Sequence, residues 1–300
     1  MKVALNLLGL ADWPGKAGDI EGLLSFAHQA DQAGIDQLLV GEHVGLCPDG
    51  FWRYPRQPFA YSAESPYYEP VTLLAAVAAV TRQIRLSTNI LISPLRPAAL
   101  LAKQLATLDV ISRGRVEFAF GVGWHKEEYD ACGVPFEGRW SRMCEQMKAC
   151  RALWSSAPAS FQGKTVQFSN LYALPHPVQG GALPLWLGVD PSPRNVERIA
   201  QFADGWAAPP ISLERIAQGV KDIRAARAAL GKSGEFPVRA TLTAVRSADS
   251  STNWDSSFAQ APDFAQAGVT MLAAMPQSYC KTQDEVPRLI ERLARLKSES

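Results

Sequence analysis

Residues able to carry chemistry follow closely after short apolar runs in this sequence. His43 follows "QLLVG" and opens a segment rich in aromatic residues. An imidazole at a strand end can orient a ligand or exchange a proton near neutral pH, although it could also only fix its loop by bonding to backbone. A later run, "GRVEFAFGVGWHKEE", passes through Gly121 and Gly123 into a charged segment. Glycines at that point would let a flat cofactor or a phosphate approach the backbone.

Two further stretches carry weaker signals. The charged run holds His125, Glu127 and Glu128, which could be catalytic, but charged residues that enter a loop are usually solvated and we expect that here. In "LSTNILISPLRP", Thr88 and Asn89 interrupt an apolar strand. Such a break indicates either a bulge beside a ligand or a polar layer inside a barrel.

The segment "GVDPSPRN" has the features of a helix start. Ser192 is a good N-cap and Pro193 a good first helical residue, so free backbone N–H groups should point outward and could bind an anion such as phosphate. Asp190 would oppose a phosphate if it faced the same pocket. Helix caps are also common without any ligand, so both interpretations stay open.

Other site chemistries lack their motifs. The four histidines are isolated, so no metal site is expected. No GxSxG elbow or Walker-type loop is present, and the third glycine of a GxGxxG fingerprint would fall at Lys126. A carboxylate pair acting as acid and base needs no local motif, so it stays possible.

Composition points to a small-molecule ligand. The chain of 300 residues has a net charge of +1, which gives no reason to expect nucleic acid as a partner. Its five cysteines are odd in number and scattered, as in a cytoplasmic protein with reduced thiols. We read "MKVALNLLGL" as a first strand rather than a signal peptide, and the run "VTLLAAVAAV" is about half the ~20 residues needed to cross a bilayer. We therefore expect no membrane association.

The elements that must position these residues alternate along the whole chain. Eight apolar runs predict strands, at 3–8, 37–40, 84–91, 116–120, 185–189, 205–208, 238–245 and 269–274. Helix-period segments follow most of them, at 20–33, 69–80, 97–111, 139–154, 193–202, 213–230 and 285–296. This order predicts one (β/α)₈ TIM barrel domain over 1–300, because continuous apolar strands need both faces covered; an open doubly wound sheet is the alternative.

Two connections are longer than the rest. The segment 42–70 is too long for an ordinary loop and too aromatic for disorder, since it carries Phe51, Trp52, Tyr54, Phe59, Tyr61, Tyr67 and Tyr68. The segment 155–183, between the helix after the fourth strand and the fifth strand, predicts a small hairpin insertion around Gly163. In a barrel of this kind the active site lies at the carboxyl ends of the strands, where His43 and the aromatic segment begin.

Two blocks of the sequence resemble a known family. "LAKQLATLDVISRGRVEFAFGVGWHKEEYDACGVPFEGR" and "PLWLGVDPSPRNVERIAQFADGW" are similar to the bacterial luciferase-like monooxygenases, which use FMN or the deazaflavin F-420. The resemblance implies a (β/α)₈ barrel with the cofactor ring at the carboxyl-terminal mouth and His43 facing it. It places a third-strand bulge, often with a non-proline cis peptide, at Asn89 and Ile90. The remaining cofactor contacts would fall on Gly121, Gly123, Trp124, Gly188, Ser192 and Pro193.

The sequence departs from this family at two places. Some deazaflavin-dependent members carry a proton-donating glutamate directly after the Gly-x-Gly pair, where this chain has Trp124. Val189, Asp190 and Pro191 replace a glycine-rich turn before the phosphate helix. The first departure argues against the mechanism of the sugar-phosphate dehydrogenases of this family. The second leaves undetermined how the phosphate-bearing tail of the cofactor would bind.

The resemblance implies an oxidoreductase acting on a small organic substrate, by FMN-based oxygenation or by deazaflavin hydride transfer. His43 would be the catalytic residue, and the aromatic segment would close over the substrate through Phe51, Trp52, Tyr54, Tyr61 and Tyr67. It allows a separate flavin reductase as partner and a homodimer. The alternative from another functional class is a non-catalytic flavin-binding barrel that acts as a carrier or sensor.

Overall fold

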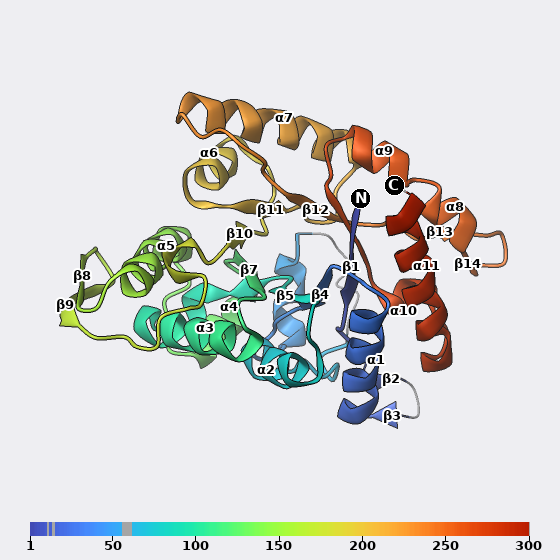
Figure 1. The fold of residues 1–300 in the computed structure, drawn as a ribbon, viewed down its shortest axis with the longest axis horizontal. Helices are drawn as coiled ribbons and strands as arrows, with labels where there is room; N and C mark the ends of the chain where they lie inside the picture. Colours follow the sequence, from blue (N-terminus) through green and yellow to red (C-terminus); the bar gives the residue numbers. More distant parts are fainter. Residues whose placement is uncertain (11, 14–15, 56–61, 300) are drawn as a thin grey trace.

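Eight parallel strands close into a barrel in the computed structural model, which describes residues 1–10, 12–13, 16–55 and 62–299 (Figure 1). Each strand pairs with the next and the last pairs with the first, all in parallel. The strands are β1 (Lys2–Asn6), β4 (Gln37–Val40), β5 (Arg85–Thr88), β7 (Val116–Gly121), β10 (Leu185–Leu187), β11 (Gly205–Ala207), β12 (Val238–Thr241) and β15 (Met271–Ala274). The pairing of β10 with β7 joins the two ends of this row of strands, so the sheet is a closed barrel and not an open sheet.

Helices surround the barrel (Figure 1). They are α1 (Ile20–Gln32), α2 (Pro70–Val80), α3 (Ala98–Ser112), α4 (Lys126–Ala131), α5 (Arg139–Ser155), α6 (Pro193–Phe202), α7 (Leu213–Ala229), α8 (Trp254–Phe258), α9 (Ala261–Gln266), α10 (Pro276–Tyr279) and α11 (Val286–Glu299). Their starts follow local sequence. The Asp19 side chain accepts from Gly22 N at 2.7 Å to cap α1, and Glu69 caps α2 ahead of Pro70.

Shorter elements lie in the loops between these strands and helices. The described residues include the 3₁₀ helices η1 (Pro48–Arg53), η2 (Ser93–Leu95), η3 (Gly180–Ala182) and η4 (Gln283–Glu285). Small antiparallel pairs join β2 (Asp12–Trp13) to β3 (Lys16–Ala17), β8 (Ala159–Gln162) to β9 (Gln167–Leu171), and β13 (Val245–Arg246) to β14 (Thr252–Asn253). The β8–β9 pair lies between α5 and β10 in the chain, at the left edge of Figure 1.

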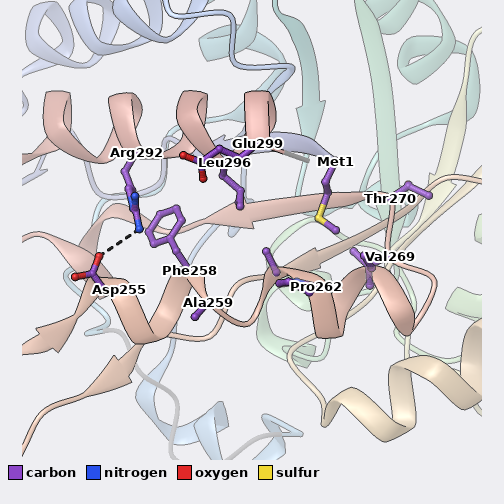
Figure 2. A pocket seen from close by; sticks show the side chains of 12 residues that line it. Met1, Asp255, Phe258, Ala259, Pro262, Val269, Thr270, Arg292, Leu296 and Glu299 are labelled. Carbon is purple, nitrogen blue, oxygen red and sulfur yellow. Dashed lines mark hydrogen bonds and ion pairs between the residues drawn. The ribbon is translucent and has the colours of Figure 1, made fainter.

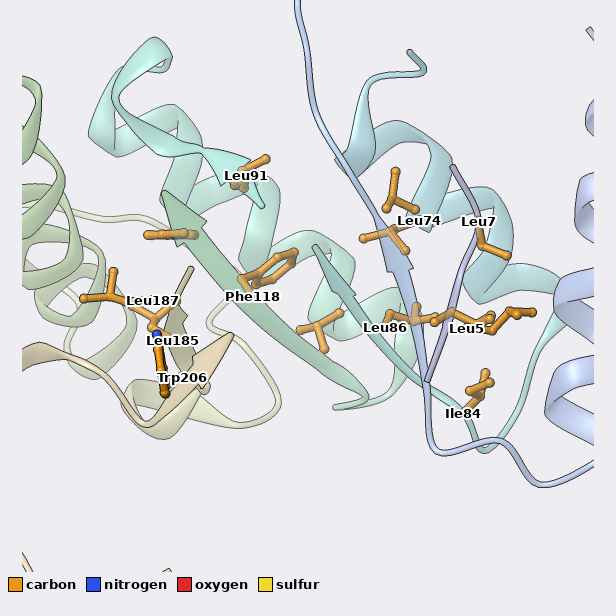
Figure 3. Packing of buried hydrophobic residues seen from close by; sticks show 14 of the residues in the cluster. Leu5, Leu7, Leu74, Ile84, Leu86, Leu91, Phe118, Leu185, Leu187 and Trp206 are labelled. Atoms are coloured by element: carbon orange, nitrogen blue, oxygen red, sulfur yellow. The ribbon is translucent and has the colours of Figure 1, made fainter. Parts of the chain in front are cut away.

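The core lies between the strands and the helices. Alternate strand residues such as Leu5, Leu86 and Phe118 are fully buried in one large apolar cluster (Figure 3). The residues between them point into the barrel, where small clusters form around Ala4 and Ala119. Burying one such Leu or Phe side chain contributes about 1.5–3 kcal/mol, which explains why the strands read as continuous apolar runs.

The predicted elements agree with the structure within a few residues, and the third predicted strand shows an informative difference. It stops at Thr88 and resumes as β6 (Leu91–Ile92), which pairs with β7. Asn89 and Ile90 lie in the interruption, and the peptide bond between them is cis, as the family resemblance predicts. No helix of the described residues combines the length and the apolar character needed to cross a bilayer.

Candidate active site

Polar and aromatic side chains gather at the carboxyl ends of the strands. His43 follows β4, Asn89 follows β5, Trp124 follows β7 and Gly188 follows β10. The carboxyl ends of parallel strands open on the same side of a barrel, so these residues share one mouth. The candidate site is therefore this mouth.

His43 and Glu128 form a paired imidazole and carboxylate at this mouth. His43 Nδ1 lies 3.1 Å from Glu128 Oε2, while Glu128 Oε1 accepts a hydrogen bond from Val44 N at 2.6 Å. The side chains of His43 and Glu128 are 11% and 1% exposed. A carboxylate that accepts at Nδ1 holds the neutral imidazole with its proton on that atom, which leaves Nε2 as the basic nitrogen.

The start of α4 holds the aromatic segment in place. His125 Nε2 accepts from Cys47 N at 2.8 Å, and Arg53 donates to Glu127 at 2.6 Å. His125 is completely buried, and burial lowers its pKa, against the pull of Glu128 and Glu127. The expectation that this run is solvated is therefore wrong for His125 and Glu128, because both face the segment after β4 rather than water.

Aromatic rings surround His43 and Trp124. The ring of Tyr67 lies edge-on to His43 at 4.8 Å between centroids, and that of Trp124 lies at 5.7 Å. Tyr54 and Phe51 contact Trp124 at 5.2 and 6.2 Å. These rings form a mostly apolar wall beside the imidazole.

Two aromatic residues predicted for the same wall differ from the rest. Trp52 is 70% exposed, and the guanidinium of Arg53 lies over its ring at 4.5 Å, so among the described residues it does not join this wall and its place in a substrate pocket stays a prediction. Tyr61 lies outside the described residues, as does Phe59.

Glycines beside the cis peptide make room for Ile90. A Cβ at Gly188 would lie 2.1 Å from Ile90 Cγ2, and a Cβ at Gly121 would lie 2.7 Å from Ile90 Cδ1. Gly123 has a φ of +63° and lies against Ile92. The absence of a side chain at these glycines therefore makes room for isoleucine side chains, and the predicted contact with a cofactor stays a prediction. Ile90 thereby gains a fixed apolar position at the mouth.

A charged group fixes the far side of the bulge. Glu42 accepts from Ile92 N at 2.6 Å and also pairs with Arg96, which reaches Glu69 at 2.6 Å. The side chain of Glu42 is 1% exposed, and burial raises its pKa although Arg96 opposes this. The chain that follows the bulge is thus anchored to the residue before His43.

Inside the barrel, the bulge rests on Arg239 of β12. Its guanidinium bonds to Thr88 O at 2.9 Å and to Asn89 Oδ1 at 3.2 Å, while Thr88 Oγ1 bonds to Ala119 O at 2.9 Å. Burial lowers the pKa of Arg239 to about 9, so it stays protonated at neutral pH. Thr88 and Asn89 therefore form both a bulge and part of a polar layer, which joins the two alternatives that the sequence left open.

The start of α6, where the sequence predicts an anion site, offers fewer free N–H donors than expected. Ser192 is the N-cap by position, but its side chain makes no capping hydrogen bond. Asn195 N already donates to Ser192 O at 2.9 Å and Pro193 has no N–H, so fewer free donors remain than predicted. Asp190 pairs with Arg215 at 2.6 Å instead of opposing an anion. The hydroxyl of Ser192 stays available beside the helix start.

Comparison with known proteins identifies the family. The family model described as luciferase-like monooxygenase matches residues 1–286. The chain belongs to this family. An uncharacterized protein of Mycobacterium tuberculosis (strain ATCC 25618 / H37Rv) is 32% identical over 272 residues, which cover 89% of this chain and 91% of that protein. An FMNH(2)-dependent dimethylsulfone monooxygenase of Pseudomonas putida is 32% identical over 187 residues, which cover 61% of this chain and 51% of that enzyme.

Solved structures show the same fold. Monooxygenase RslO1 from Streptomyces bottropensis superimposes with a TM-score of 0.83, 21% identity and full coverage of both chains. An F-420-dependent secondary alcohol dehydrogenase superimposes with a TM-score of 0.77 and 15% identity, covering 98% of each chain. At these identities the likeness of this luciferase-like chain to both structures concerns the barrel alone.

A separate pocket of this luciferase-like protein lies at the opposite end of the barrel. It has a volume of about 570 Å³ and lies between α9 and α11, where Met1 and Thr270 precede their strands (Figure 2). Asp255 and Arg292 pair at 3.2 Å along its edge. It is therefore remote from His43 and does not belong to the mouth.

Sequence reasoning misses Glu42 and Arg239 and assigns Glu128 the wrong environment. Glu128 lies in a charged run that the sequence predicts to be solvated, and no sequence signal distinguishes Glu42 except that it directly precedes His43. Arg239 was hidden inside the strand "VRAT". A charged residue within an apolar strand is the signal that indicates Arg239, because an arginine is almost never fully buried unless other groups compensate its charge.

Proposed function

We propose that this protein is an oxidoreductase that uses reduced FMN to oxygenate a small organic substrate at the mouth of its barrel. The observation that carries the proposal is the His43–Glu128 pair, which places an oriented imidazole beside an apolar, aromatic wall. The family match and the FMNH(2)-dependent relative support this choice of reaction. The single-domain organisation over 1–300 and a separate flavin reductase as partner belong to the same proposal.

The residues of the mouth are suited to a flavin-type ring and its phosphate. Ile90, held by Gly121 and Gly188, offers an apolar face, and Trp124 offers a second one. An amide at Asn89 supplies polar contacts of the kind that ring carbonyls need. The hydroxyl of Ser192 at the start of α6, together with Pro193 and the Gly123 turn, would hold the polar end.

Reduced FMN, when bound, supplies the electrons that activate dioxygen for insertion of one oxygen atom into an organic substrate. His43 would hold or move a proton through Nε2, since Glu128 fixes the proton on Nδ1. Glu128 touches neither substrate nor cofactor in this arrangement, so we assign it a positioning role.

The aromatic segment would exclude water from the site. Phe51, Tyr54 and Tyr67 bring three rings to the wall, and Tyr61 is proposed for it from sequence alone. Exclusion of water strengthens local electrostatic interactions and prevents side reactions of a reactive bound species. A wall of this character favours a substrate that is largely apolar.

Hydride transfer with F-420 is the second candidate. It is supported by the F-420-dependent alcohol dehydrogenase, which shares the barrel over 98% of this chain. Trp124 stands where some such enzymes carry a proton-donating glutamate, so His43 would be the group left to move the proton. We place this reaction second for that reason.

A non-catalytic flavin carrier or sensor is the alternative from another class. Such a protein needs a cofactor cradle but has no use for an imidazole oriented by a buried carboxylate. The His43–Glu128 pair therefore favours an enzyme. Burying the carboxylate of Glu128 costs desolvation free energy, and such a group is retained where it orients a catalytic base.

The deciding experiment titrates the purified protein separately with reduced FMN and reduced F-420 without oxygen, then admits air with a panel of small apolar substrates. We expect tight binding of reduced FMN and oxygenated product that requires both dioxygen and substrate. Binding of F-420 alone, with product formed without oxygen, would support the second candidate. Saturation without turnover of any substrate would support a carrier.

Matched variants locate the chemistry. His43→Gln should keep cofactor affinity and lower turnover by roughly 10²–10⁴-fold, the usual contribution of a general acid or base. His28→Gln is the control, because His28 lies on the outer helix α1 and bonds to Val80 O, at the end of α2, at 3.0 Å. Equal turnover in His43→Gln and the control would refute the assignment of His43.

A further inference from the structure

Arg239 is a buried cation without a carboxylate partner among the described residues. It is 2% exposed, and its hydrogen bonds all go to neutral acceptors: Gln37 Oε1 at 2.5 Å, Ser87 Oγ at 3.1 Å, Thr88 O at 2.9 Å and Asn89 Oδ1 at 3.2 Å. The carboxylate of Glu117 bonds instead to Gln37 and to Arg85. Glu117 therefore favours the charged form of Arg239 only from a distance and through Gln37, and on the side of the bulge the guanidinium meets no carboxylate among the described residues.

Such a charge is costly unless something compensates it. Removing an ion from water costs several kcal/mol, and neutral hydrogen bonds recover only part of that cost. A purely structural strut across the barrel could use a neutral side chain or a paired one. An unpaired cation one hydrogen bond below the mouth is better explained by a negative charge that arrives with a ligand.

The contact with Arg239 also determines how the Asn89 amide is turned. A guanidinium can only donate, so the amide atom that faces it must be the carbonyl oxygen. The NH₂ group of Asn89 then points away from Arg239. Asn89 is half-buried beside Ile90, and the described residues supply no acceptor to this NH₂ group. Its two donors are left for a ligand at the mouth.

We propose that Arg239 is a positioning residue that turns the Asn89 NH₂ group toward the mouth and makes it a stronger donor, so that the site prefers a ligand acceptor carrying negative charge. This inference rests on the proposed function, in which that ligand is a reduced flavin-type cofactor. The pyrimidine half of such a ring has carbonyl acceptors and gains negative charge on reduction at neutral pH. A donor polarised by a cation binds a charged acceptor more strongly than a neutral one.

The test compares affinities for the two redox states of one cofactor. Dissociation constants for oxidised and reduced FMN are measured without oxygen in the wild type, Asn89→Asp and Arg239→Gln. Asn89→Asp removes the NH₂ donor and gives Arg239 an ion-pair partner, so it should fold even if Arg239→Gln does not. Glu117→Gln is the control for charge in this layer, because Glu117 acts on Arg239 only from a distance and through Gln37, and its loss leaves both Arg239 and the Asn89 NH₂ group in place.

We expect the wild type and Glu117→Gln to bind reduced FMN about tenfold or more tightly than oxidised FMN, since a hydrogen bond to a charged group is worth roughly 10- to 150-fold in affinity. Asn89→Asp should lower this ratio at least about tenfold, and so should Arg239→Gln if it folds. An unchanged ratio in folded Asn89→Asp would overturn the inference and leave the proposed function intact. If neither FMN nor F-420 binds to the wild type, the proposed function fails, and the inference fails with it.

Discussion

Replacing Glu128 with glutamine should invert the proton arrangement of His43. Val44 N can only donate, and it lies 2.6 Å from Glu128 Oε1, so the new amide must keep its carbonyl oxygen on Val44. Its NH₂ group then faces His43 Nδ1, 3.1 Å away, where the carboxylate had accepted. The neutral imidazole has to move its proton to Nε2, and the basic nitrogen at the mouth is lost.

The size of the effect follows from the hydrogen bond that is exchanged. A bond to a charged, buried partner contributes about 1.5–3 kcal/mol, and the side chain of Glu128 is 1% exposed. If the active tautomer is disfavoured by that amount, turnover falls by roughly 10- to 150-fold. The free energy of unfolding should change much less than in Glu128→Ala, which would leave both Val44 N and His43 without this acceptor.

Two assays check this prediction. Nitrogen NMR of labelled protein reports which ring nitrogen of His43 carries the proton, with His28 as an internal reference. A double-mutant cycle with His43→Gln tests whether Glu128 acts through His43, because the second substitution should then cost almost nothing more. The same tautomer in Glu128→Gln as in the wild type, or full additivity of the two losses, would refute the reasoning.

Three other outcomes follow from the structure. Gly188→Ala should destabilise the fold by about 1–3 kcal/mol and weaken cofactor binding, because its Cβ would lie 2.1 Å from Ile90 Cγ2; unchanged urea unfolding would contradict this. His125→Phe should cost about 1–3 kcal/mol at pH 7.5, since the Cys47 N–H loses its acceptor. This cost should shrink as pH falls below the ordinary histidine value of 6.5: burial lowers the pKa of folded His125, so the unfolded wild type binds more protons and loses stability that the variant keeps. A pH-independent difference between the two unfolding curves would argue against a buried neutral His125.

Sequence determined the fold because its signals are local. Apolar runs of strand length alternate with helical periods, and each reflects how one segment must bury its own surface. The run "VEFAF" at 116–120 places a large apolar residue at every second position. In β7 this alternation puts Phe118 in the outer core and Ala119 inside the barrel. The position of His43 at the mouth could also be predicted, because a barrel sends every strand end to the same side. The bulge was one of two interpretations of Thr88 and Asn89, and the family resemblance implied its place at Asn89 and Ile90.

Tertiary structure alone decided the electrostatics of the site. His43 and Glu128 lie 85 positions apart, and Arg239 lies 150 positions from Asn89, so no spacing in the sequence links either pair. Whether a charged run is solvated or buried depends on what packs over it, which is why the sequence alone does not reveal that Glu128 is buried. The glycines give the same lesson, since only the fold showed that Gly188 makes room for Ile90. Local patterns fix which surfaces must be buried, and closure of the barrel fixes which groups meet.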